Sequence, residues 1–547
     1  MARTDAPLFS DKYTNDQAST LVRRYLRVHG PVTLTEIQKA LDLPEDILKQ
    51  ILADLYKERE LVCGKLVVGV KSEQWCNRQN FAELYHRAIA VRREVLQSAN
   101  REIFYRFLLH WHRLGMEGQS MQELIKRYSG FCLPPYIFER ELLRSRMCVR
   151  DIKKMPELME QLSGLIARGE VIVRANRNSE EGRRNVGFIL RGEGHLFSRK
   201  ADLLDVAQRL EDPANTVFDF LQENGASLVR DVVAGTGLST TQVNDGLSTL
   251  TNHGLASCDN YQTFMLMLQH KSVEIKKENN DPWLQVAGPD WRIRGQRRRQ
   301  RQSIRKTVLE SIQLHEGRWF LTISFAVLGK EMDEATRAER QARMLLQRYG
   351  ILVKEWYRRE HGLLPWYQLF HILKRMEWQD EVRRGYFIEG LSGIQFALPE
   401  AVELLEKLQS ESKPMPLPPL LISTIDPVLP FGGAFDWDLH DSRGNKITVI
   451  RSASNHLIFL DDRPVLYSEN FGTRLWTLIN LTEEATNSVA TVMKSWLQLP
   501  QILRPRKRIE ILHINETPAT GSPLAKNFLQ NGFERDGKKL VLWPSGI

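Results

Sequence analysis

Aspartates near the C-terminus are the residues of this chain best suited to hydrolytic chemistry. A carboxylate can stabilise the positive charge that develops on a sugar when a glycosidic bond breaks, or it can activate the attacking water. Cleavage of an N-glycosidic bond is therefore one chemistry these groups could perform. An aspartate between short strands more often forms a turn, so spacing alone favours no single residue. The candidates within residues 420–547 are Asp426, Asp436, Asp438, Asp441, Asp461, Asp462 and Asp536.

Nucleotide hydrolysis has no support in the sequence, because no GxxxxGK[ST] phosphate-binding loop occurs. The pair Gly329–Lys330 lacks the earlier glycine, and the DEAT tetrapeptide Asp333–Thr336 follows polar residues rather than an apolar strand. We interpret this tetrapeptide as the start of a solvated helix. We therefore expect that the chain does not hydrolyse ATP by itself.

The cysteines indicate neither a metal site nor a disulfide framework. The chain has five, an odd number, and they form no CxxC pair. Closely spaced pairs are the usual sign of a zinc site, and disulfides belong to oxidising compartments. We expect no metal, no other cofactor and a cytoplasmic location.

Positive charge is the strongest electrostatic signal. The formal net charge of +9 favours a polyanionic partner such as DNA. The arginine-rich segment Arg292–Arg305 would make binding salt-dependent, because each neutralised phosphate releases counterions. The alternative is a solvated linker without a partner. The residues expected to contact DNA are Arg292, Arg294, Arg297, Arg298, Arg299, Arg301, Arg183, Arg184, Arg383, Arg384, Lys538 and Lys539.

Aromatic side chains gather between residues 356 and 378. They could stack on an unpaired or flipped base. Their helical spacing favours the alternative, a stripe that faces the protein core. The residues concerned are Trp356, Tyr357, Trp366, Tyr367, Phe370 and Trp378.

A unit that recurs about four times must position these residues. In the clearest copy, helical segments at Leu21–Gly30 and Thr33–Leu41 precede a helix at Pro44–Glu60 and a strand–glycine–strand pattern at Leu61–Val70. Apolar residues at Ile47, Ile51, Leu52 and Leu55 occupy one face of that last helix. This order is typical of a winged helix-turn-helix, whose second helix enters a DNA groove.

The pattern predicts a mainly α fold with β hairpins, in which tandem winged-helix domains precede a C-terminal β-barrel-like α+β module. Composition changes at the polar segment after residue 270 and at the proline-rich Glu411–Pro419 mark the boundaries. The predicted parts are winged helix 1 with a linking helix (1–98), a helical or winged-helix unit (99–211), winged helix 3 (212–270), a basic linker (271–303), winged helix 4 (304–410) and the C-terminal module (420–547).

Several motifs resemble the C-terminal region of the Lhr (large helicase-related) bacterial helicases. The similarity extends in order along nearly the whole chain, but the two motor domains of that family do not precede residue 1. Either the chain is a piece of a longer protein, or it is a free-standing homologue whose motor is lost or separate. The motifs are YLRVHGP (25–31), EQWCNRQN (73–80), FYRFLLHWHRL (104–114), EGRW (316–319), QRYG (347–350), GYFIEGLSGIQFALP (385–399), DPVLPFG (426–432) and INETPATGSPLAKNFLQNG (514–532).

This resemblance implies a DNA-repair function. The Lhr region is similar to AlkZ-type DNA glycosylases, and some of its members excise uracil, which implies a monofunctional uracil-DNA glycosylase here. The essential aspartate of the family lies near the chain end, and Asp536 is the only aspartate after Asp462. The resemblance therefore implies Asp536 as the catalytic residue. The glutamine pair of the AlkZ type has no match, which argues against alkylation-adduct chemistry.

The expected partner is single-stranded or damaged duplex DNA, bound in the nucleoid with little sequence preference. A helicase motor subunit and a second copy of the chain are further candidate partners. No run approaches the ~20 apolar residues of a membrane span, so a membrane partner is not expected. The rival reading is a non-enzymatic DNA-binding or docking scaffold for a separately encoded helicase. A transcription regulator is disfavoured, because it usually needs only one or two winged helices.

Overall fold

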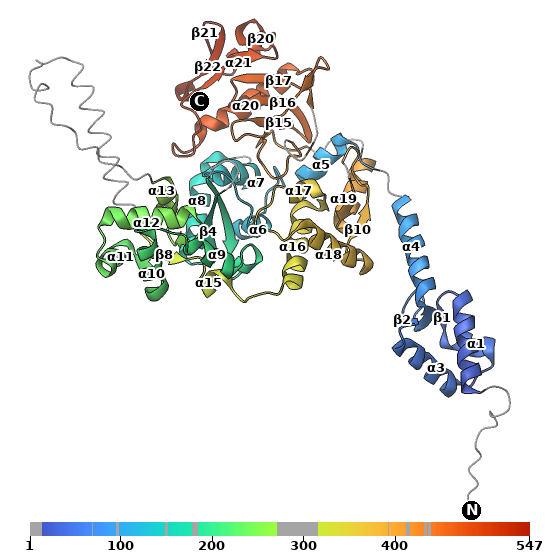
Figure 1. The fold of residues 1–547 in the computed structure, drawn as a ribbon. Coiled ribbons are helices and arrows are strands. Elements are labelled where there is room, and N and C mark those ends of the chain that lie inside the picture. The colour runs from blue at the N-terminus through green and yellow to red at the C-terminus, as the bar shows by residue number, and fades with distance from the viewer. Residues whose placement is uncertain are drawn as a thin grey trace, which may run out of the picture. The chain divides into compact units, whose positions relative to one another are not determined.

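The computed structural model describes residues 14–67, 69–94, 98–147, 151–177, 184–270, 316–391, 393–411, 416–431, 435 and 439–546. By its internal contacts the chain divides into two units, Met1–Gln97 and Ser98–Ile547. Helices predominate and the sheets are small (Figure 1). None of the helices within the described ranges is long and apolar enough to cross a membrane.

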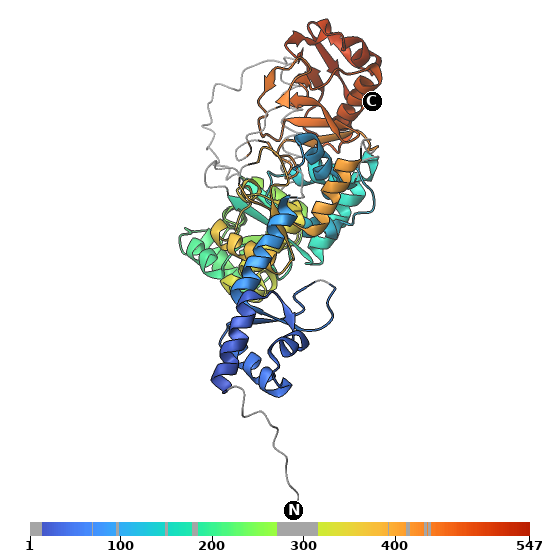
Figure 2. The same cartoon turned by 90° about the vertical axis from the view of Figure 1, so that its right-hand side faces the viewer.

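The first unit has the element order of a winged helix-turn-helix. Thr33 caps α2 through a capping box with Glu36, which satisfies two backbone donors at the helix start. In α3 the buried face comprises Leu48, Ile51, Leu52 and Leu55, so the helix is turned slightly from the predicted face that began at Ile47. Figure 2 shows the blue helices of this unit beside its small sheet, which has the order β1-β3-β2. The elements are α1 (Asn15–Val28), β1 (Val32–Thr33), α2 (Leu34–Leu41), α3 (Glu45–Lys57), β2 (Leu61–Gly64), β3 (Gln74–Asn77) and α4 (Arg78–Glu94).

The first part of the second unit packs helices around one long hairpin. Strands β4 and β5 pair antiparallel over seven residues each, from Val171↔Leu190 to Arg177↔Arg184. Their inward side chains join a large apolar core with α8, α10, α12 and α13. The elements are α5 (Arg101–Trp111), α6 (Met121–Arg127), the π-helical η1 (Phe138–Leu143), α7 (Arg144–Met147), α8 (Met155–Ala167), β4 (Val171–Arg177), β5 (Arg184–Leu190), η3 (Gly194–Leu196) and α9 (Lys200–Ala207).

The next small sheet receives its middle strand, β8, from residues that follow the segment 271–315. Its strand order is β6-β8-β7, and Trp319 of β8 pairs with Ser227 on one side and Cys258 on the other. From the sequence, the residues of β8 were expected in the following unit, whereas their pairing partners lie in the preceding one. The elements are α10 (Ala214–Asn224), β6 (Ser227–Leu228), α11 (Val229–Thr236), α12 (Thr240–Asn252), β7 (Ala256–Cys258), α13 (Tyr261–Gln269), β8 (Arg318–Leu321) and α15 (Phe325–Leu328).

A further helix–helix–hairpin arrangement follows. The sheet has the order β10-β11-β9, and the neighbouring helices α16 and α18 pack against each other. Its elements are α16 (Glu334–Tyr349), β9 (Ile351–Leu352), α17 (Lys354–Tyr357), α18 (Trp366–Trp378), β10 (Arg383–Gly385), β11 (Gln395–Ala397) and α19 (Pro399–Ser410).

The C-terminal part is rich in strands, as predicted, but its described strands close no barrel. The six-stranded sheet has the order β12-β15-β16-β17-β19-β20, with β12 and β20 as open edges. Helix α20 lies between β17 and β19 in the chain, and these two strands pair in parallel. A separate sheet has the order β18-β22-β21. The elements are β12 (Leu420–Ser423), β13 (Leu439–His440), β14 (Lys446–Ile447), β15 (His456–Leu460), β16 (Arg463–Glu469), β17 (Arg474–Thr477), α20 (Glu483–Gln498), β18 (Ile509–Ile511), β19 (His513–Ile514), β20 (Thr517–Pro518), α21 (Ala525–Gln530), β21 (Glu534–Asp536) and β22 (Lys539–Leu542).

Candidate nucleic-acid interface

Helix α18 presents an aromatic stripe to solvent. Leu369, Leu373 and Met376, at i, i+4 and i+7, are buried and fix the inward face of the helix. The opposite face carries Tyr367, His371, Arg375 and Trp378, which are all exposed. Tyr367 is 62% exposed and Trp378 is 63% exposed, although large aromatic side chains normally lie inside. The stripe takes no part in the packing of the apolar core.

The adjoining hairpin extends the stripe. Tyr386, just after β10, is 66% exposed, and Arg383 is exposed without an ion pair among the described residues. Arg384 points elsewhere, because its Nε lies 3.2 Å from the buried carboxylate of Glu377. Of the two arginines predicted to contact DNA here, Arg383 is therefore free to do so, while Arg384 is engaged in holding the hairpin to α18.

The predicted aromatic group divides between core and surface. Trp356 is fully buried and stacks on Tyr349 with ring centroids 4.8 Å apart. Trp366 and Phe370 are half-buried and contact each other. Only Tyr367 and Trp378 are strongly exposed. Helical spacing by itself did not distinguish these faces, because aromatic residues occupy positions all round the helix.

Other predicted DNA-contacting residues are less accessible or fall outside the described ranges. Arg292, Arg294, Arg297, Arg298, Arg299, Arg301 and Arg183 lie outside them. Arg184 donates a hydrogen bond to the carbonyl oxygen of Leu268 at the end of α13. Helix α12, at the recognition-helix position of the third unit, buries Val243, Leu247 and Leu250 and has no Lys or Arg. It is therefore a core helix.

The C-terminal hairpin carries the remaining predicted residues. Asp536 ends β21, Lys539 opens β22, and the two pair across the turn at Gly537. The Asp536 carboxylate is 62% exposed and lies 3.2 Å from Lys539 Nζ, which also lies 3.2 Å from Glu510. Hydrogen bonds to both carboxylates raise the pKa of Lys539. Lys538 is exposed. The arrangement offers an accessible carboxylate beside the ammonium group of Lys539, and it is also an ordinary hairpin turn.

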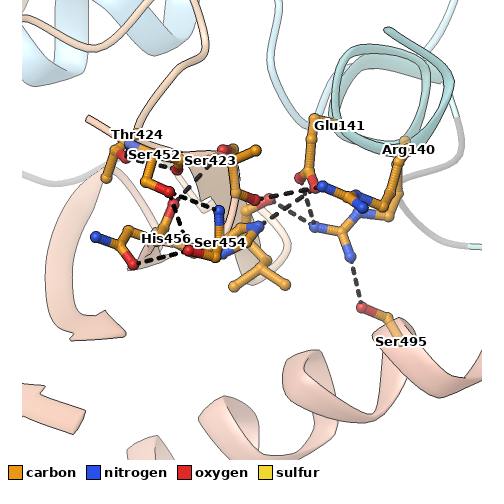
Figure 3. Close-up of polar contacts among 12 residues, drawn as sticks. Arg140, Glu141, Ser423, Thr424, Ser452, Ser454, His456 and Ser495 are labelled. Carbon is orange, nitrogen blue, oxygen red and sulfur yellow. Dashed lines mark hydrogen bonds and ion pairs between the residues drawn. The ribbon is translucent and has the colours of Figure 1, made fainter. Parts of the chain in front are cut away.

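A different carboxylate, Glu141, is deeply buried between η1 and the C-terminal sheet. Figure 3 shows Glu141 and Arg140 facing His456 and a serine-rich turn. Glu141 lies 2.8 Å from Arg140 Nε, 3.6 Å from Arg144 Nη2 and 3.3 Å from His456 Nε2. Burial alone would raise the pKa of Glu141, but His456 and the two arginines outweigh it and hold that pKa at about 2. Burial also lowers the pKa of His456, although the Glu141 carboxylate opposes that shift.

Asp426 of the DPVLPFG motif is also a structural anchor. Its carboxylate oxygens each accept a hydrogen bond of 2.9 Å from Arg146, and both side chains are at most 1% exposed. Tyr128 accepts further hydrogen bonds from Arg146 at 2.8 and 3.1 Å. The ion pair, like Glu141, fastens the helical part of the unit to the C-terminal sheet. Neither carboxylate is placed to meet a substrate.

Known proteins resemble this chain in one domain and, at low identity, along most of its length. Residues 331–416, which contain α16, α18 and the hairpin, match the family described as the winged-helix domain of the large helicase-related protein. An Lhr helicase/probable uracil glycosylase of Mycolicibacterium smegmatis is 24% identical over 484 residues, which cover 84% of this chain and 29% of that protein. An Lhr helicase/uracil glycosylase of Escherichia coli is 22% identical over 549 residues, which cover 94% of this chain and 33% of that protein.

The chain spans about a third of the length of these two relatives. Their similarity runs along most of the chain, at low identity. The resemblance inferred from the sequence motifs is thus confirmed: residues 331–416 match the winged-helix domain of the large helicase-related protein, and the chain is similar to Lhr proteins along most of its length.

Proposed function

We propose that this chain is a DNA-binding repair protein built from tandem winged helices, and that α18 with its hairpin is the principal DNA contact. The observation that supports this most directly is the exposed stripe of Tyr367, Trp378 and Tyr386 on the winged-helix domain of an Lhr-related chain. His371 adds a hydrogen-bonding group to the α18 stripe, and Arg383 adds an exposed cation on the hairpin.

Exposed aromatic rings favour unpaired bases over an intact duplex. Stacking on an aromatic side chain contributes about 1–3 kcal/mol per base and tolerates any sequence, because every base has a π-face. We therefore propose single-stranded or damaged DNA as the ligand, bound with little sequence preference. Arg383 would contact a phosphate, which fixes register without reading bases.

The test is fluorescence anisotropy with a labelled single-stranded oligonucleotide. The double variant Tyr367→Ala/Trp378→Ala should weaken binding by at least about tenfold, from the loss of two stacking contacts. Phe325→Ala is the matched control, because Phe325 is an aromatic residue on α15 that is 78% exposed. Equal affinities for the double variant and the wild type would refute the proposed interface.

The finer proposal is that the chain hydrolyses the N-glycosidic bond of uracil in DNA, with Asp536 as the essential carboxylate. The names of both relatives support the activity, and the exposure of Asp536 leaves it open to a nucleotide. The carboxylate would stabilise positive charge on the deoxyribose and help to activate water. Lys538 and Lys539 would hold the neighbouring phosphates.

Uracil-containing oligonucleotides, followed by alkali, measure this activity as strand cleavage. Asp536→Asn keeps the shape of the side chain and removes its charge, and it should abolish cleavage. Glu534→Gln is the matched control, since Glu534 is an exposed carboxylate on the same strand. Cleavage at the wild-type rate by Asp536→Asn would show that Asp536 is not catalytic.

A docking scaffold for a separate helicase motor is the second candidate function. The buried Glu141 and Asp426 networks favour it, because they place charge in rigid structural roles rather than near a substrate. The same cleavage assay separates the two functions. If the wild type binds uracil-containing DNA without producing alkali-labile sites, the scaffold takes the place of the glycosylase.

A further inference from the structure

A small polar cavity lies beside the loop that leads into α18. Its volume is about 190 Å³, and it is enclosed by the β4–β5 hairpin, the segment at Gly130 and Cys132, the end of η3 and the segment at His361 and Gly362. Engineered cavities of roughly 150 Å³ bind benzene, so this cavity has room for one six-membered ring. Its polar lining residues are Cys132, Arg174, Asn176, Ser198 and His361, and its apolar wall comprises Ile189 and Phe197.

Two polar atoms of the residues that line the cavity are buried and have no hydrogen-bond partner among the described residues. Arg174 donates one bond of 2.6 Å to Ser198 Oγ, but its Nε is buried without a partner. His361 Nδ1 is likewise buried without a partner. Arg174 forms no ion pair among the described residues, and its pKa is lowered by burial, which nearby Cys132 offsets only in part. Buried polar atoms of native proteins are nearly always bonded, so the protein's own side chains leave this wall of the cavity incompletely satisfied.

The walls of the cavity are held rigidly by α16. Arg348, which is fully buried, donates a hydrogen bond to the Ser129 carbonyl next to Gly130 and pairs with Glu360 next to His361. Gln341 donates to the Gly362 carbonyl at 3.2 Å, and Arg337 donates to the same carbonyl at 3.1 Å. Two opposite walls are thus fixed by one helix. A cavity whose walls are held by a second shell of this kind is preorganised for binding.

The chemistry of the lining fits the edge of a pyrimidine base. Uracil presents two carbonyl acceptors on either side of one N–H donor. The carboxamide of Asn176 can donate to a carbonyl and accept from that N–H, and the guanidinium of Arg174 can donate to a second carbonyl. Enzymes that act on an extruded base read its pairing edge by such bonds and pack its faces between apolar side chains. Phe197 and Ile189 supply apolar surface here.

We propose that this cavity binds one unpaired pyrimidine base of DNA, with Asn176 and Arg174 reading its carbonyl edge. The proposal rests on the proposed function, since it supplies the base pocket for a strand lying on α18. His361 and Gly362 lie in the loop between α17 and α18, so the pocket adjoins the helix that carries the exposed stripe. Asn176 and Arg174 would be specificity-determining residues.

The test compares two single-stranded oligonucleotides that differ only in one base. One carries 2′-fluoro-2′-deoxyuridine, whose fluorine withdraws electrons from the sugar and prevents cleavage, and the other carries an abasic analogue at the same position. The ratio of their dissociation constants measures base recognition alone. The wild type should prefer the uracil oligonucleotide by about tenfold, as expected for a paired set of hydrogen bonds to a base.

Asn176→Asp replaces a donor by an acceptor of the same shape and should bring the ratio close to one, with unchanged affinity for the abasic oligonucleotide. Arg174→Gln should reduce the ratio as well. Asn185→Asp is the matched control, because Asn185 is paired with Asn176 across the hairpin but does not line the cavity. Retained affinity for the abasic oligonucleotide shows that each variant is folded.

Three outcomes would overturn the base pocket. The first is a wild type that binds the uracil and abasic oligonucleotides with equal affinity. The second is a set of variants that keep the wild-type ratio of dissociation constants. The third is a set of variants that bind both oligonucleotides more weakly by the same factor, which would indicate a phosphate contact instead. The glycosylase proposal fails separately. A protein that shows the base preference and its loss in Asn176→Asp, but cleaves no uracil DNA, supports the pocket and refutes only the catalytic reading.

Discussion

Replacing Asp426 by Ala should destabilise the second unit strongly, because it strands the charge of Arg146 in the core. Asp426 accepts two hydrogen bonds of 2.9 Å from Arg146, and a third from the Val428 amide at 3.0 Å. Burial opposes the charge of Arg146, but Asp426 and Tyr128 outweigh it and raise the pKa of the guanidinium. An arginine guanidinium does not lose its proton in proteins, so Arg146 stays charged in the variant. Removing one partner of a buried pair typically costs about 3–5 kcal/mol.

The unit comprises residues 98–547, so its unfolding entropy is large. At roughly 2.1 cal/mol/K per residue, a unit of about 450 residues has an unfolding entropy near 1 kcal/mol/K. A loss of about 3–5 kcal/mol should then lower the melting temperature by only about 3–5 °C. Differential scanning calorimetry resolves such a shift.

The double variant Asp426→Ala/Arg146→Met separates the stranded charge from the lost hydrogen bonds. Replacement of a buried ion pair by apolar residues is often nearly neutral, so the double variant should melt above the single Asp426→Ala variant. A single variant that melts within about 1 °C of the wild type would refute the reasoning on the ion pair. A double variant that melts below the single variant would refute the account based on a stranded charge.

Three further predictions concern charge. The pKa of Glu141 is about 2, below its unfolded value. Its contribution to the free energy of unfolding is therefore present above pH 4.5 and is lost as pH falls toward 2. In thermal melts between pH 3 and pH 6, the melting temperature of Glu141→Gln should fall less with decreasing pH than that of the wild type. Burial raises the pKa of Glu139 to about 7, so the folded state resists its ionisation and loses stability as pH rises from 4.5 to 7. Glu139→Gln should therefore raise the melting temperature more at pH 8 than at pH 5, and an equal effect at both would contradict the shift. Replacing Arg297, Arg298 and Arg299 by Ala should weaken DNA binding and reduce the magnitude of its logarithmic salt slope by up to about 2–3, whereas an unchanged salt titration would exclude a role for the arginine run.

The sequence by itself determined the local elements and the family resemblance. Capping pairs such as Thr33 with Glu36, and apolar spacing such as Leu52 with Leu55, depend only on neighbours along the chain, so they could be read directly. The QRYG and GYFIEGLSGIQFALP motifs lie within the matched winged-helix domain. Each is a run of neighbouring residues, so the resemblance could also be recognised without the tertiary structure. Two-residue strands such as β6 could not be foreseen, because they form only when β8 arrives from about ninety residues later in the chain.

Tertiary structure decided which charges and aromatic rings are available. Tyr367 and Trp356 look alike in sequence, but one is exposed and the other is in the core, because packing against α16 and the C-terminal part selects the buried face. Arg383 and Arg384 are neighbours, and only Arg384 meets the Glu377 carboxylate. Asn176 and Arg174 lie two residues apart on β4, whereas His361 comes from a distant segment. Hydrogen bonds from α16 hold the Ser129 and Gly362 segments beside that strand, so the cavity forms only in the folded chain.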